Sequence, residues 1–360
     1  MAKQLKDLIN EENVGELASS IKRVHSKFNE NQFMLTIFNE SWVDLSLMER
    51  SNHITTTLGE FLPNEYPSAL AIIDQVISEA DIFLPVAMTG FVPMFGLEEK
   101  YFDLSISALK NYTEYGTSEF AVRPFIEKYE EKMLLIMLEW AKDENEHVRR
   151  LASEGCRPAL PWGKALKKYK VDPTPILPVL EKLKNDDAKY VQKSVANNIN
   201  DIAKTHPDLV VELMKKWYGK NKNTDWIVKH GCRTLLKQGN PAVLEIFGFH
   251  DTKSIEVTDF EIDKTVVPKG EELQFSFTLQ AMVDTKVRLE YGVDFMKANG
   301  KQNRKIFQIS EISMKAKATK SYTKIHRFAD LSTRKHYPGA HGITLIVNGV
   351  ARGSLGFELA

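Results

Sequence analysis

The feature that most constrains the fold is an amphipathic segment that recurs along the middle of the chain. The copies are 147–155 (HVRRLASEG), 190–202 (YVQKSVANNINDI) and 227–237 (IVKHGCRTLLK). Their first core valines, Val148, Val191 and Val228, are 43 and 37 residues apart. This spacing is typical of HEAT or armadillo-like helical hairpins, which bury their apolar faces against one another in a curved solenoid.

The residue pattern changes close to residue 249. Before it, apolar residues recur at helical spacing, with Pro and Gly at loop distances. After it, apolar and polar residues alternate in short runs: SIEVTDFEID, ELQFSFTLQA, KVRLEYGVDF, RKIFQIS and GITLIVNGV. About seven short strands of this kind are typical of an antiparallel sandwich. We therefore predict a mainly α chain with an all-β C-terminal domain: a HEAT-like α-helical solenoid over 1–249, then an immunoglobulin-like β-sandwich over 253–360.

The composition narrows the compartment and the chemistry. Cys156 and Cys232 are the two cysteines and form no C-x-x-C pair, so we expect buried, reduced thiols in a cytoplasmic protein. The first residues, MAKQLKDLINEENVGEL, lack the apolar core of a signal peptide, and we expect no membrane span. The nine histidines are scattered without zinc-site spacing, so we expect neither a metal nor a cofactor.

A net charge of zero hides a segregated charge distribution. Residues 1–141 carry 11 Lys and Arg against 22 Asp and Glu, and residues 142–237 carry 20 against 12. Residues 297–337 carry 11 against 2. Two basic segments of this kind suit a polyanion such as DNA, with the second segment acting as a clamp on the groove or backbone. The competing interpretation is a solvated, solubilising surface.

Helical projection of the three copies separates a core face from a polar face. The predicted core residues are Val148, Leu151, Ala152, Gly155, Val191, Val195, Ile199, Ile202, Val228, Cys232, Leu235 and Leu236. The predicted outer residues are Arg150, Glu154, Lys193, Asn197, Asp201, His230, Arg233 and Lys237. Glu154 and Asp201 thus interrupt a basic wall. Because carboxylates repel a phosphate backbone, their presence there favours a catalytic task over simple DNA binding.

These segments resemble the AlkC branch of the AlkC/AlkD DNA alkylation-repair glycosylases. The resemblance lies in 39–63 (NESWVDLSLMERSNHITTTLGEFLP), 117–126 (TSEFAVRPFI), 147–162 (HVRRLASEGCRPALPW), 193–204 (KSVANNINDIAK) and 225–241 (DWIVKHGCRTLLKQGNP). An appended immunoglobulin-like domain is typical of AlkC-type members. The resemblance implies a monomer that binds duplex DNA containing alkylated bases, excising cationic bases such as 3-methyladenine and 3-methylcytosine without a deep base-flipping pocket.

Carried over by position, the resemblance implies three active-site acids, Glu119, Glu154 and Asp201. It also implies that Trp162 and Asn197 contact the lesion, with Asn198 beside Asn197. We expect DNA to be bound by Arg149, Arg150, Arg157, Lys193, Lys229, His230, Arg233, Lys237, Lys305 and Lys317.

Carboxylates alone suffice for this chemistry. Breaking an N-glycosidic bond builds positive charge on the deoxyribose, which a carboxylate stabilises while it positions a water. A cationic base leaves as a neutral molecule and needs no general acid. We expect Asp201 or Glu154 to face the sugar, with Glu119 completing the acidic cluster. No lysine stands out from the solvated charge runs, which argues against a Schiff-base lyase.

Each of these residues also has a structural interpretation. Glu119 with Arg123, and Arg150 with Glu154, have the i, i+4 spacing of intrahelical ion pairs, whereas Asp201 has Asn197 at i−4. Trp162 fits a plug between hairpins, and the other two tryptophans of the basic segment, Trp217 and Trp226, fit the core.

Two other functions compete with a glycosylase. One is a non-catalytic HEAT-repeat scaffold that binds DNA or a protein, because such arrays are commonly scaffolds. The other is an RNA- or nucleotide-binding protein, which no RNP-like aromatic motif supports.

Overall fold

The computed structural model describes residues 4–81, 83–250, 253–330 and 335–360. The chain divides into two compact units, one of residues 1–205 with 219–231 and one of residues 206–218 with 232–360. Within the described ranges, none of the helices has both the length and the apolar character that crossing a membrane requires.

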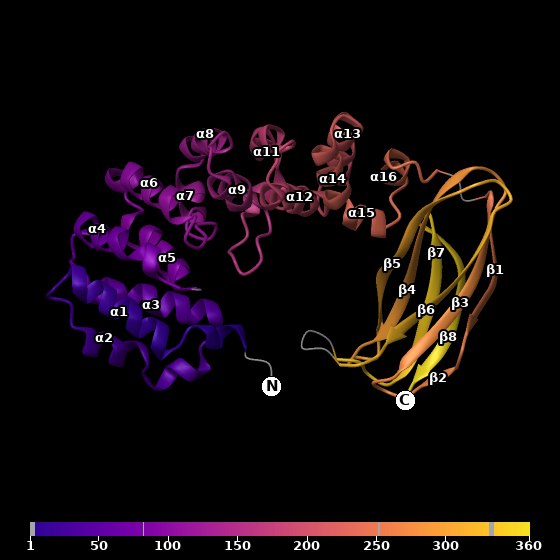
Figure 1. Cartoon of the computed structure of the whole chain (residues 1–360), viewed down its shortest axis with the longest axis horizontal. Coiled ribbons are helices and arrows are strands. Elements are labelled where there is room, and N and C mark those ends of the chain that lie inside the picture. The colour runs from indigo at the N-terminus through magenta and orange to yellow at the C-terminus, as the bar shows by residue number, and fades with distance from the viewer. Residues whose placement is uncertain (1–3, 82, 251–252, 331–334) are drawn as a thin grey trace. The chain divides into compact units, whose positions relative to one another are not determined.

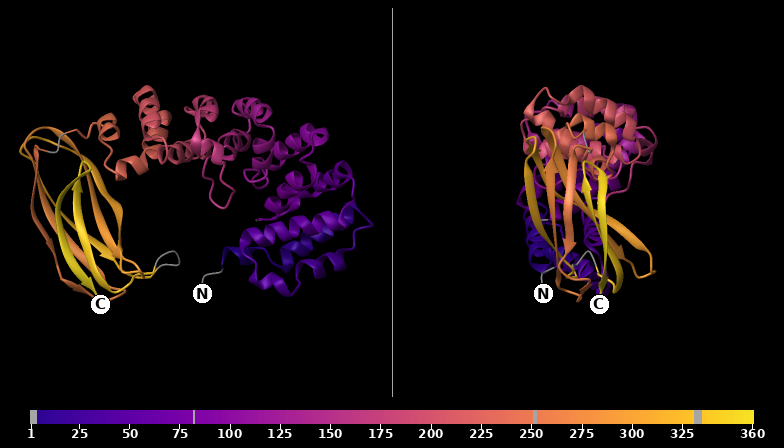
Figure 2. Two further views of the ribbon diagram at one scale, coloured as in Figure 1. Left: turned by 180° about the vertical axis from the view of Figure 1, so that it is seen from behind. Right: turned by 90° about the vertical axis from the view of Figure 1, so that its right-hand side faces the viewer.

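The first unit is built of stacked helices (Figures 1 and 2). They are α1 (Glu11–Val24), α2 (Glu30–Ile37), α3 (Leu47–Phe61), α4 (Tyr66–Val76), α5 (Leu84–Gly96), α6 (Phe102–Tyr112), α7 (Arg123–Lys128), α8 (Glu130–Trp140), α9 (Glu146–Gly155), α10 (Lys167–Val171), α11 (Leu177–Leu183), α12 (Lys189–Ala203) and α14 (Lys222–Gly231). Helix α3 packs on α5, α9 on α12, and α12 on α14. In both figures α8 and α11 form an outer layer and α9 and α12 an inner one.

The core face predicted for the recurring segments is confirmed, but the prediction that Glu154 and Asp201 lie on the outer face is wrong. Each is 5% exposed, because α9 packs against α12 and Arg157 pairs with both carboxylates. Every residue predicted for the core face is buried, from Val148 in α9 to Leu236. Local signals also set the ends of these helices: the Asn145 side chain accepts a hydrogen bond from the His147 amide and caps α9 at its N-terminus. The solenoid therefore follows from local periodicity and capping.

The second unit contains the β-sandwich. Its strands are β1 (Ile255–Ile262), β2 (Val266–Val267), β3 (Glu272–Ala281), β4 (Thr285–Met296), β5 (Gln302–Met314), β6 (Thr319–Arg327), β7 (Gly339–Val347) and β8 (Val350–Leu359). One sheet has the order β1-β3-β6 and the other β2-β8-β7-β4-β5. Strand β3 shows why the alternation predicted a sandwich, because its alternate residues Leu273, Phe275, Phe277 and Leu279 are buried between the sheets.

Three helices belong to the second unit as well: α13 (Pro207–Trp217), α15 (Arg233–Lys237) and α16 (Pro241–Ile246). The turn before α16 touches the β7–β8 turn, where a Cβ on Gly239 would lie 2.9 Å from the carbonyl oxygen of Gly349. Both glycines have positive φ, 69° and 77°, which suits residues without a side chain. The change from helix to strand lies near residue 250, but the compact units divide earlier, so 1–249 as the boundary of the functional domain stays a prediction.

Candidate active site

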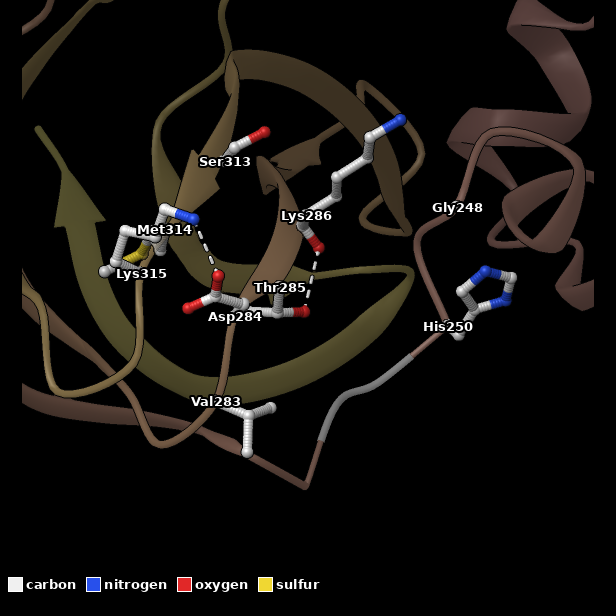
Figure 3. A pocket seen from close by; sticks show the side chains of 9 residues that line it. All are labelled: Gly248, His250, Val283, Asp284, Thr285, Lys286, Ser313, Met314 and Lys315. Carbon is white, nitrogen blue, oxygen red and sulfur yellow. Dashed lines mark hydrogen bonds and ion pairs between the residues drawn. The ribbon is translucent and has the colours of Figure 1, made fainter.

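A hollow of about 540 Å³ lies in the second unit, and few of the side chains that line it could catalyse the release of a DNA base (Figure 3). Its lining includes Lys286, Lys315 and His250, and its acid is Asp284. The Asp284 carboxylate accepts from Lys315 Nζ at 2.7 Å and from the Ala316 amide at 2.9 Å. This hollow therefore offers one carboxylate, already occupied, at the surface of the sandwich.

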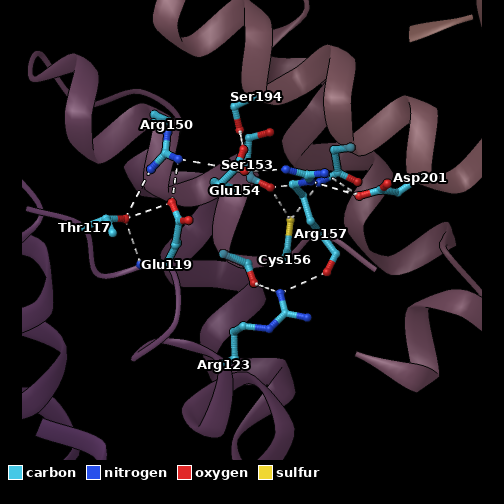
Figure 4. Close-up of polar contacts among 12 residues, drawn as sticks. Thr117, Glu119, Arg123, Arg150, Ser153, Glu154, Cys156, Arg157, Ser194 and Asp201 are labelled. Carbon is cyan, nitrogen blue, oxygen red and sulfur yellow. Dashed lines mark hydrogen bonds and ion pairs between the residues drawn. The ribbon is translucent and has the colours of Figure 1, made fainter. Parts of the chain in front are cut away.

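The three predicted acids lie close together in the first unit (Figure 4). Glu119 precedes α7, Glu154 is in the last turn of α9 and Asp201 is in α12; their exposed fractions are 8%, 5% and 5%. Packing of α9 against α12 joins the last two, which are far apart in the sequence.

Two arginines lie between the acids. Arg150 Nη2 is 2.5 Å from Glu119 Oε2. Arg157 Nη1 is 2.5 Å from Glu154 Oε1, and its Nη2 is 2.9 Å from Asp201 Oδ2. Acids and cations therefore alternate across the site, and burial of these charges is offset by their pairing.

Neutral and charged donors at the edges complete this charge cluster. Ser194 Oγ donates to Glu154 Oε2 at 2.6 Å, and Thr117 Oγ1 donates to Glu119 Oε2 at 2.9 Å. Lys204 Nζ lies 3.0 Å from Asp201 Oδ1. Each carboxylate is thus held in one orientation by at least two groups.

The electrostatics keep Arg157 charged. Burial by itself lowers the pKa of Arg157, but Glu154 and Asp201 outweigh that effect and raise the pKa above its ordinary value. A permanent cation thus separates these two acids. A carboxylate can stabilise positive charge on a substrate only if the substrate can come next to that carboxylate.

A cleft of about 240 Å³ opens next to the charge cluster. Glu119, Glu154 and Arg157 line one part of it. Its apolar lining consists of Met48, Phe83, Val86, Phe120, Leu160, Pro161 and Trp162. Asp201 does not line this cleft in the described structure, and its side chain is 2% exposed. Glu154 and Glu119 are therefore the carboxylates that a ligand in the cleft would meet.

Trp162 is not the plug that the sequence allowed. It is 63% exposed and lies in the loop between α9 and α10, at the rim of the cleft. Its φ of 61° is in the left-handed region, which costs a residue with a side chain roughly 1–2 kcal/mol. The surrounding structure must compensate for holding an exposed indole in this conformation.

The predicted intrahelical pairs form only in part. Glu119 and Arg123 do not pair: the Arg123 guanidinium donates to backbone carbonyls instead. Arg150 Nη2 is 3.8 Å from Glu154 Oε1, a weaker contact than its 2.5 Å contact with Glu119. Asp201 has two cationic partners. Lys204 lies at i+3 from Asp201 in the sequence, whereas Arg157 is 44 residues away and no local pattern links it to Asp201.

The arginines predicted to bind DNA are largely engaged within the protein. Arg149 Nε lies 2.6 Å from Asp186 Oδ2, and Arg149 Nη1 donates to the carbonyls of Asp143 and Glu144. Arg150 and Arg157 belong to the charge cluster. The structure therefore gives these three residues a structural task, and a contact with DNA stays a prediction for each.

The predicted lysines are more accessible. Lys193, Lys229, Lys237, Lys305 and Lys317 are exposed, and Arg233 is half-buried. Lys305 is on β5 and Lys317 is in the β5–β6 turn; these strands are edge strands of the two sheets. Among the predicted DNA-binding residues, the exposed cations are thus lysines, each of which presents a compact point charge on a flexible stem.

The remaining predicted residues differ in how deeply they are buried. Asn197 is half-buried, and Asn198 is fully buried and donates to the Ser153 carbonyl at 2.8 Å. Trp217 is core, as predicted. Trp226 is only half-buried: His230 stacks on it with ring centres 4.9 Å apart.

Lys189, which no sequence pattern singled out, lies over the ring of Trp226. Its Nζ lies 3.0 Å from the centre of the Trp226 ring. Burial and the charge of Lys193 lower the pKa of Lys189. Trp226 is thus a platform for cations on the surface of the first unit, which corrects its prediction as a core residue.

The cysteines match the prediction of buried thiols. Cys156 and Cys232 are both free and buried, and burial raises the pKa of each thiol to about 12. Across the described residues, no group of three or more His, Cys, Asp and Glu side chains is arranged to hold a metal ion.

Known proteins match both parts of the chain. A family model for DNA alkylation repair enzymes matches residues 106–235, and a model for the C-terminal Ig-like domain of the uncharacterised protein YhaZ matches residues 256–360. The uncharacterized protein YhaZ of Bacillus subtilis (strain 168) is 44% identical over 355 residues, which cover 99% of each chain.

A solved structure decides the branch. The Pseudomonas fluorescens alkylpurine DNA glycosylase AlkC, bound to DNA containing an abasic site analog, matches with a TM-score of 0.95 and 34% identity over 99% of this chain and 100% of that chain. The chain belongs to the AlkC branch of the DNA alkylation repair enzymes. Membership of the AlkC branch confirms the resemblance seen in the sequence and the predicted fold, a helical solenoid followed by an Ig-like sandwich.

Proposed function

We propose that this enzyme is a monofunctional DNA glycosylase that hydrolyses the N-glycosidic bond of cationic N-alkylated bases in duplex DNA. The substrates we expect are 3-methylcytosine and 3-methyladenine. The observation that carries the proposal is the pair of carboxylates, Glu119 and Glu154, that opens on an apolar cleft rimmed by an exposed Trp162. The likeness to AlkC, an alkylpurine DNA glycosylase, supports the purine of these two substrates, 3-methyladenine. The expectation of 3-methylcytosine, a pyrimidine, rests on its positive charge, which lets the base leave as a neutral molecule.

Glu154 is best placed to act on the sugar. Arg157 and Ser194 each hold one of its carboxylate oxygens, at 2.5 Å and 2.6 Å, so it is oriented before substrate arrives. A preoriented carboxylate stabilises the oxocarbenium-like charge on the deoxyribose and positions the attacking water. Glu119 adds a second negative charge at the cleft.

Asp201 acts from behind Arg157. Its Oδ2 accepts from Arg157 Nε at 2.9 Å, and this contact orients the guanidinium that holds Glu154. Without Asp201, only one of the two carboxylates that balance Arg157 remains, and Glu154 becomes its main partner. Asp201 therefore keeps part of the charge of Glu154 available for the transition state.

Trp162 supplies the lesion contact. Its exposed indole stacks against the damaged nucleotide, an interaction worth ~1–3 kcal/mol per base. Asn197 contributes a further contact. The lysines Lys193, Lys229, Lys237, Lys305 and Lys317, with His230 and Arg233, bind the DNA backbone. Action as a monomer and a cytoplasmic location remain predictions.

The alternative is a non-catalytic scaffold that binds DNA or a protein. Burying ionised carboxylates costs several kcal/mol per ion before pairing. A scaffold for a polyanion gains nothing from two carboxylates, Glu119 and Glu154, in the lining of its cleft. The buried acids therefore favour the enzyme.

The deciding experiment is single-turnover release of free base from duplex oligonucleotides containing 3-methylcytosine, and from alkylated genomic DNA. Wild type is expected to release base and Asp201→Asn to lose that activity. Asp186→Asn is the control, because Asp186 is also an arginine-paired aspartate, with a 5% exposed side chain, but does not line the cleft. Salt-sensitive DNA binding without release of any alkylated base would establish the scaffold instead.

A further inference from the structure

Arg123 is a buried cation that meets backbone carbonyls in place of an acid. It is 3% exposed. Its Nε donates to the Lys164 carbonyl at 2.8 Å, and its Nη1 donates to the carbonyls of Gly155 and Arg157, both at 2.9 Å. Burial lowers the pKa of Arg123 to about 10. Burying a guanidinium without an acidic partner is energetically unfavourable, so we expect its hydrogen bonds to have a structural role.

The three carbonyls mark the ends of two functional segments. Gly155 is the last residue of α9, where unpaired carbonyls form the negative end of the helix dipole and favour a cation. Arg157 and Lys164 lie at the two ends of the loop that carries Trp162. One guanidinium thus closes that loop and fixes it to the helix that carries Glu154. Figure 4 shows Arg123 below Arg157, with its guanidinium bonded to the Arg157 carbonyl.

A glycine makes this contact possible. A Cβ on Gly155 would lie 2.6 Å from Val122 Cγ1, closer than real side chains approach. Gly155 therefore lets the end of α9 touch the residue that precedes Arg123. Glycine is unfavourable inside a helix by roughly 0.5–1 kcal/mol relative to alanine, which the close approach offsets.

We propose that Arg123 is a positioning residue that holds Trp162 at a set place relative to Glu154. Trp162 is exposed and has a left-handed backbone, so its own packing does little to maintain its position. The guanidinium fork provides the missing constraint by binding both ends of the loop. This inference rests on the proposed function, because it concerns the geometry of the same cleft.

The test compares two buried arginines. Arg123→Lys keeps the positive charge but replaces the planar fork by a single ammonium that cannot bridge the same carbonyls. Arg50→Lys is the control: Arg50 is 5% exposed and does not line the cleft. It donates to the carbonyls of Lys6 and Ile9, and its Nη1 lies 3.7 Å from Asp7 Oδ1.

We expect Arg123→Lys to lower the single-turnover rate about 10-fold to 100-fold, as a misplacement of about 1 Å does, with DNA affinity changed less than about 3-fold. Arg50→Lys is expected to lower the melting temperature and to leave the rate of the folded protein unchanged. Equal rate losses in the two variants would overturn the proposal, because a general loss of stability would then explain both.

A double-mutant cycle separates positioning from stability. Adding Arg123→Lys to Trp162→Ala is expected to cost little further rate, because the loop no longer carries the indole that Arg123 positions. The full loss in both backgrounds would overturn the proposal.

A third measurement does not depend on excision. Lys164 has a 75% exposed side chain in this loop, and mass spectrometry detects tryptic cleavage after it. We expect faster cleavage there in Arg123→Lys and an unchanged rate in Arg50→Lys. If Arg123→Lys does not fold, Pro161→Gly loosens the loop with Arg123 in place and is expected to speed cleavage and slow excision. An unchanged cleavage rate in every folded loop variant would overturn the proposal. If Arg123→Lys is cleaved faster but the wild-type protein releases no base, the role of Arg123 in holding the loop stands and the proposed glycosylase function is wrong.

Discussion

The charge cluster around Glu154 and the basic surface of the sandwich use charge in opposite ways. In the cluster, the side chains of Arg150 and Arg157 are 14% and 8% exposed and each meets carboxylates. On the sandwich, Lys305 and Lys317 are exposed, and no ion pair to either is found among the described residues. Cationic side chains therefore hold acids in fixed positions inside the charge cluster, whereas on the sandwich they give the surface a positive electrostatic field.

The difference predicts different responses to mutation. Removing one partner of a buried pair strands the other charge, and costs about 3–5 kcal/mol. Removing an exposed lysine changes stability by roughly 0.5 kcal/mol or less, but removes one interaction with a phosphate. Substitutions in the cluster should change chemistry and stability, whereas those on the sandwich should change DNA affinity and its dependence on salt.

The largest effect is expected for the acids of the cluster. Glu154→Gln and Asp201→Asn keep the shape and remove the charge, so the single-turnover excision rate should fall by about 10²-fold or more. DNA affinity should change little, because both acids lie among cations. Single-turnover assays with saturating enzyme measure the rate. A Glu154→Gln enzyme as fast as wild type would remove Glu154 from the mechanism, and a greater loss for Asp201→Asn would place Asp201 at the sugar.

A smaller effect is expected for Trp162. Trp162→Ala should slow excision about 10-fold to 100-fold, in line with loss of ~1–3 kcal/mol of stacking. Tyr115→Ala, which removes another exposed aromatic outside the cleft, is the control. Trp162→Gly should be as slow as Trp162→Ala yet more stable by roughly 1 kcal/mol, because glycine has no penalty at a φ of 61°. Thermal unfolding measures that difference. A glycine variant less stable than the alanine variant would show that the backbone at residue 162 is not strained.

The sandwich lysines should affect binding and leave chemistry unchanged. The double variant Lys305→Gln/Lys317→Gln should weaken DNA binding several-fold, and the slope of log K against log salt should fall by about 1 for each phosphate that is no longer neutralised. Excision by saturating enzyme should not change. Lys132→Gln, on acidic α8, is the control. An unaltered salt slope would show that this surface only solubilises the protein.

The smallest effect concerns the cysteines, which sharpen the contrast between buried and exposed groups. Because burial raises the pKa of Cys156 and Cys232 to about 12, the reactive thiolate is scarce at a pH of about 8.5, the ordinary pKa of a free cysteine, in the folded protein. A thiol reagent should therefore label the native protein slowly and the denatured protein at both cysteines at once. Rapid labelling of native protein would show local opening of α9 or of the segment around Cys232.

The elements were predictable where the signal is local. Val191, Val195 and Ile199 repeat at helical spacing, and all three are buried as the spacing required. The run ELQFSFTLQA alternates at period two and matches β3 from end to end. These patterns report the burial of one face, which a helix or a strand decides from its own residues.

The sequence predicted that the three acids belong together, but it did not predict their contacts. The segments around Glu119, Glu154 and Asp201 resembled the AlkC branch, and the structure brings these acids together. The i, i+4 rule assigned Arg123 to Glu119, but Arg123 binds carbonyls 32 to 41 residues away. Trp162 was placed at the site, but nothing local indicated its left-handed backbone.

The sequence by itself determined a helical solenoid joined to an immunoglobulin-like sandwich, the apolar face that each element buries, and the three acids expected at the site. It determined them because periodicity, capping and residue type act over a few neighbouring positions. Only the tertiary structure decided which cation meets which acid, that Asp201 stands behind Arg157, and that Arg123 closes the loop of Trp162. The long-range contacts among these join residues 31 to 44 positions apart, and the packing of α9 against α12 and against the start of α7 sets their distances.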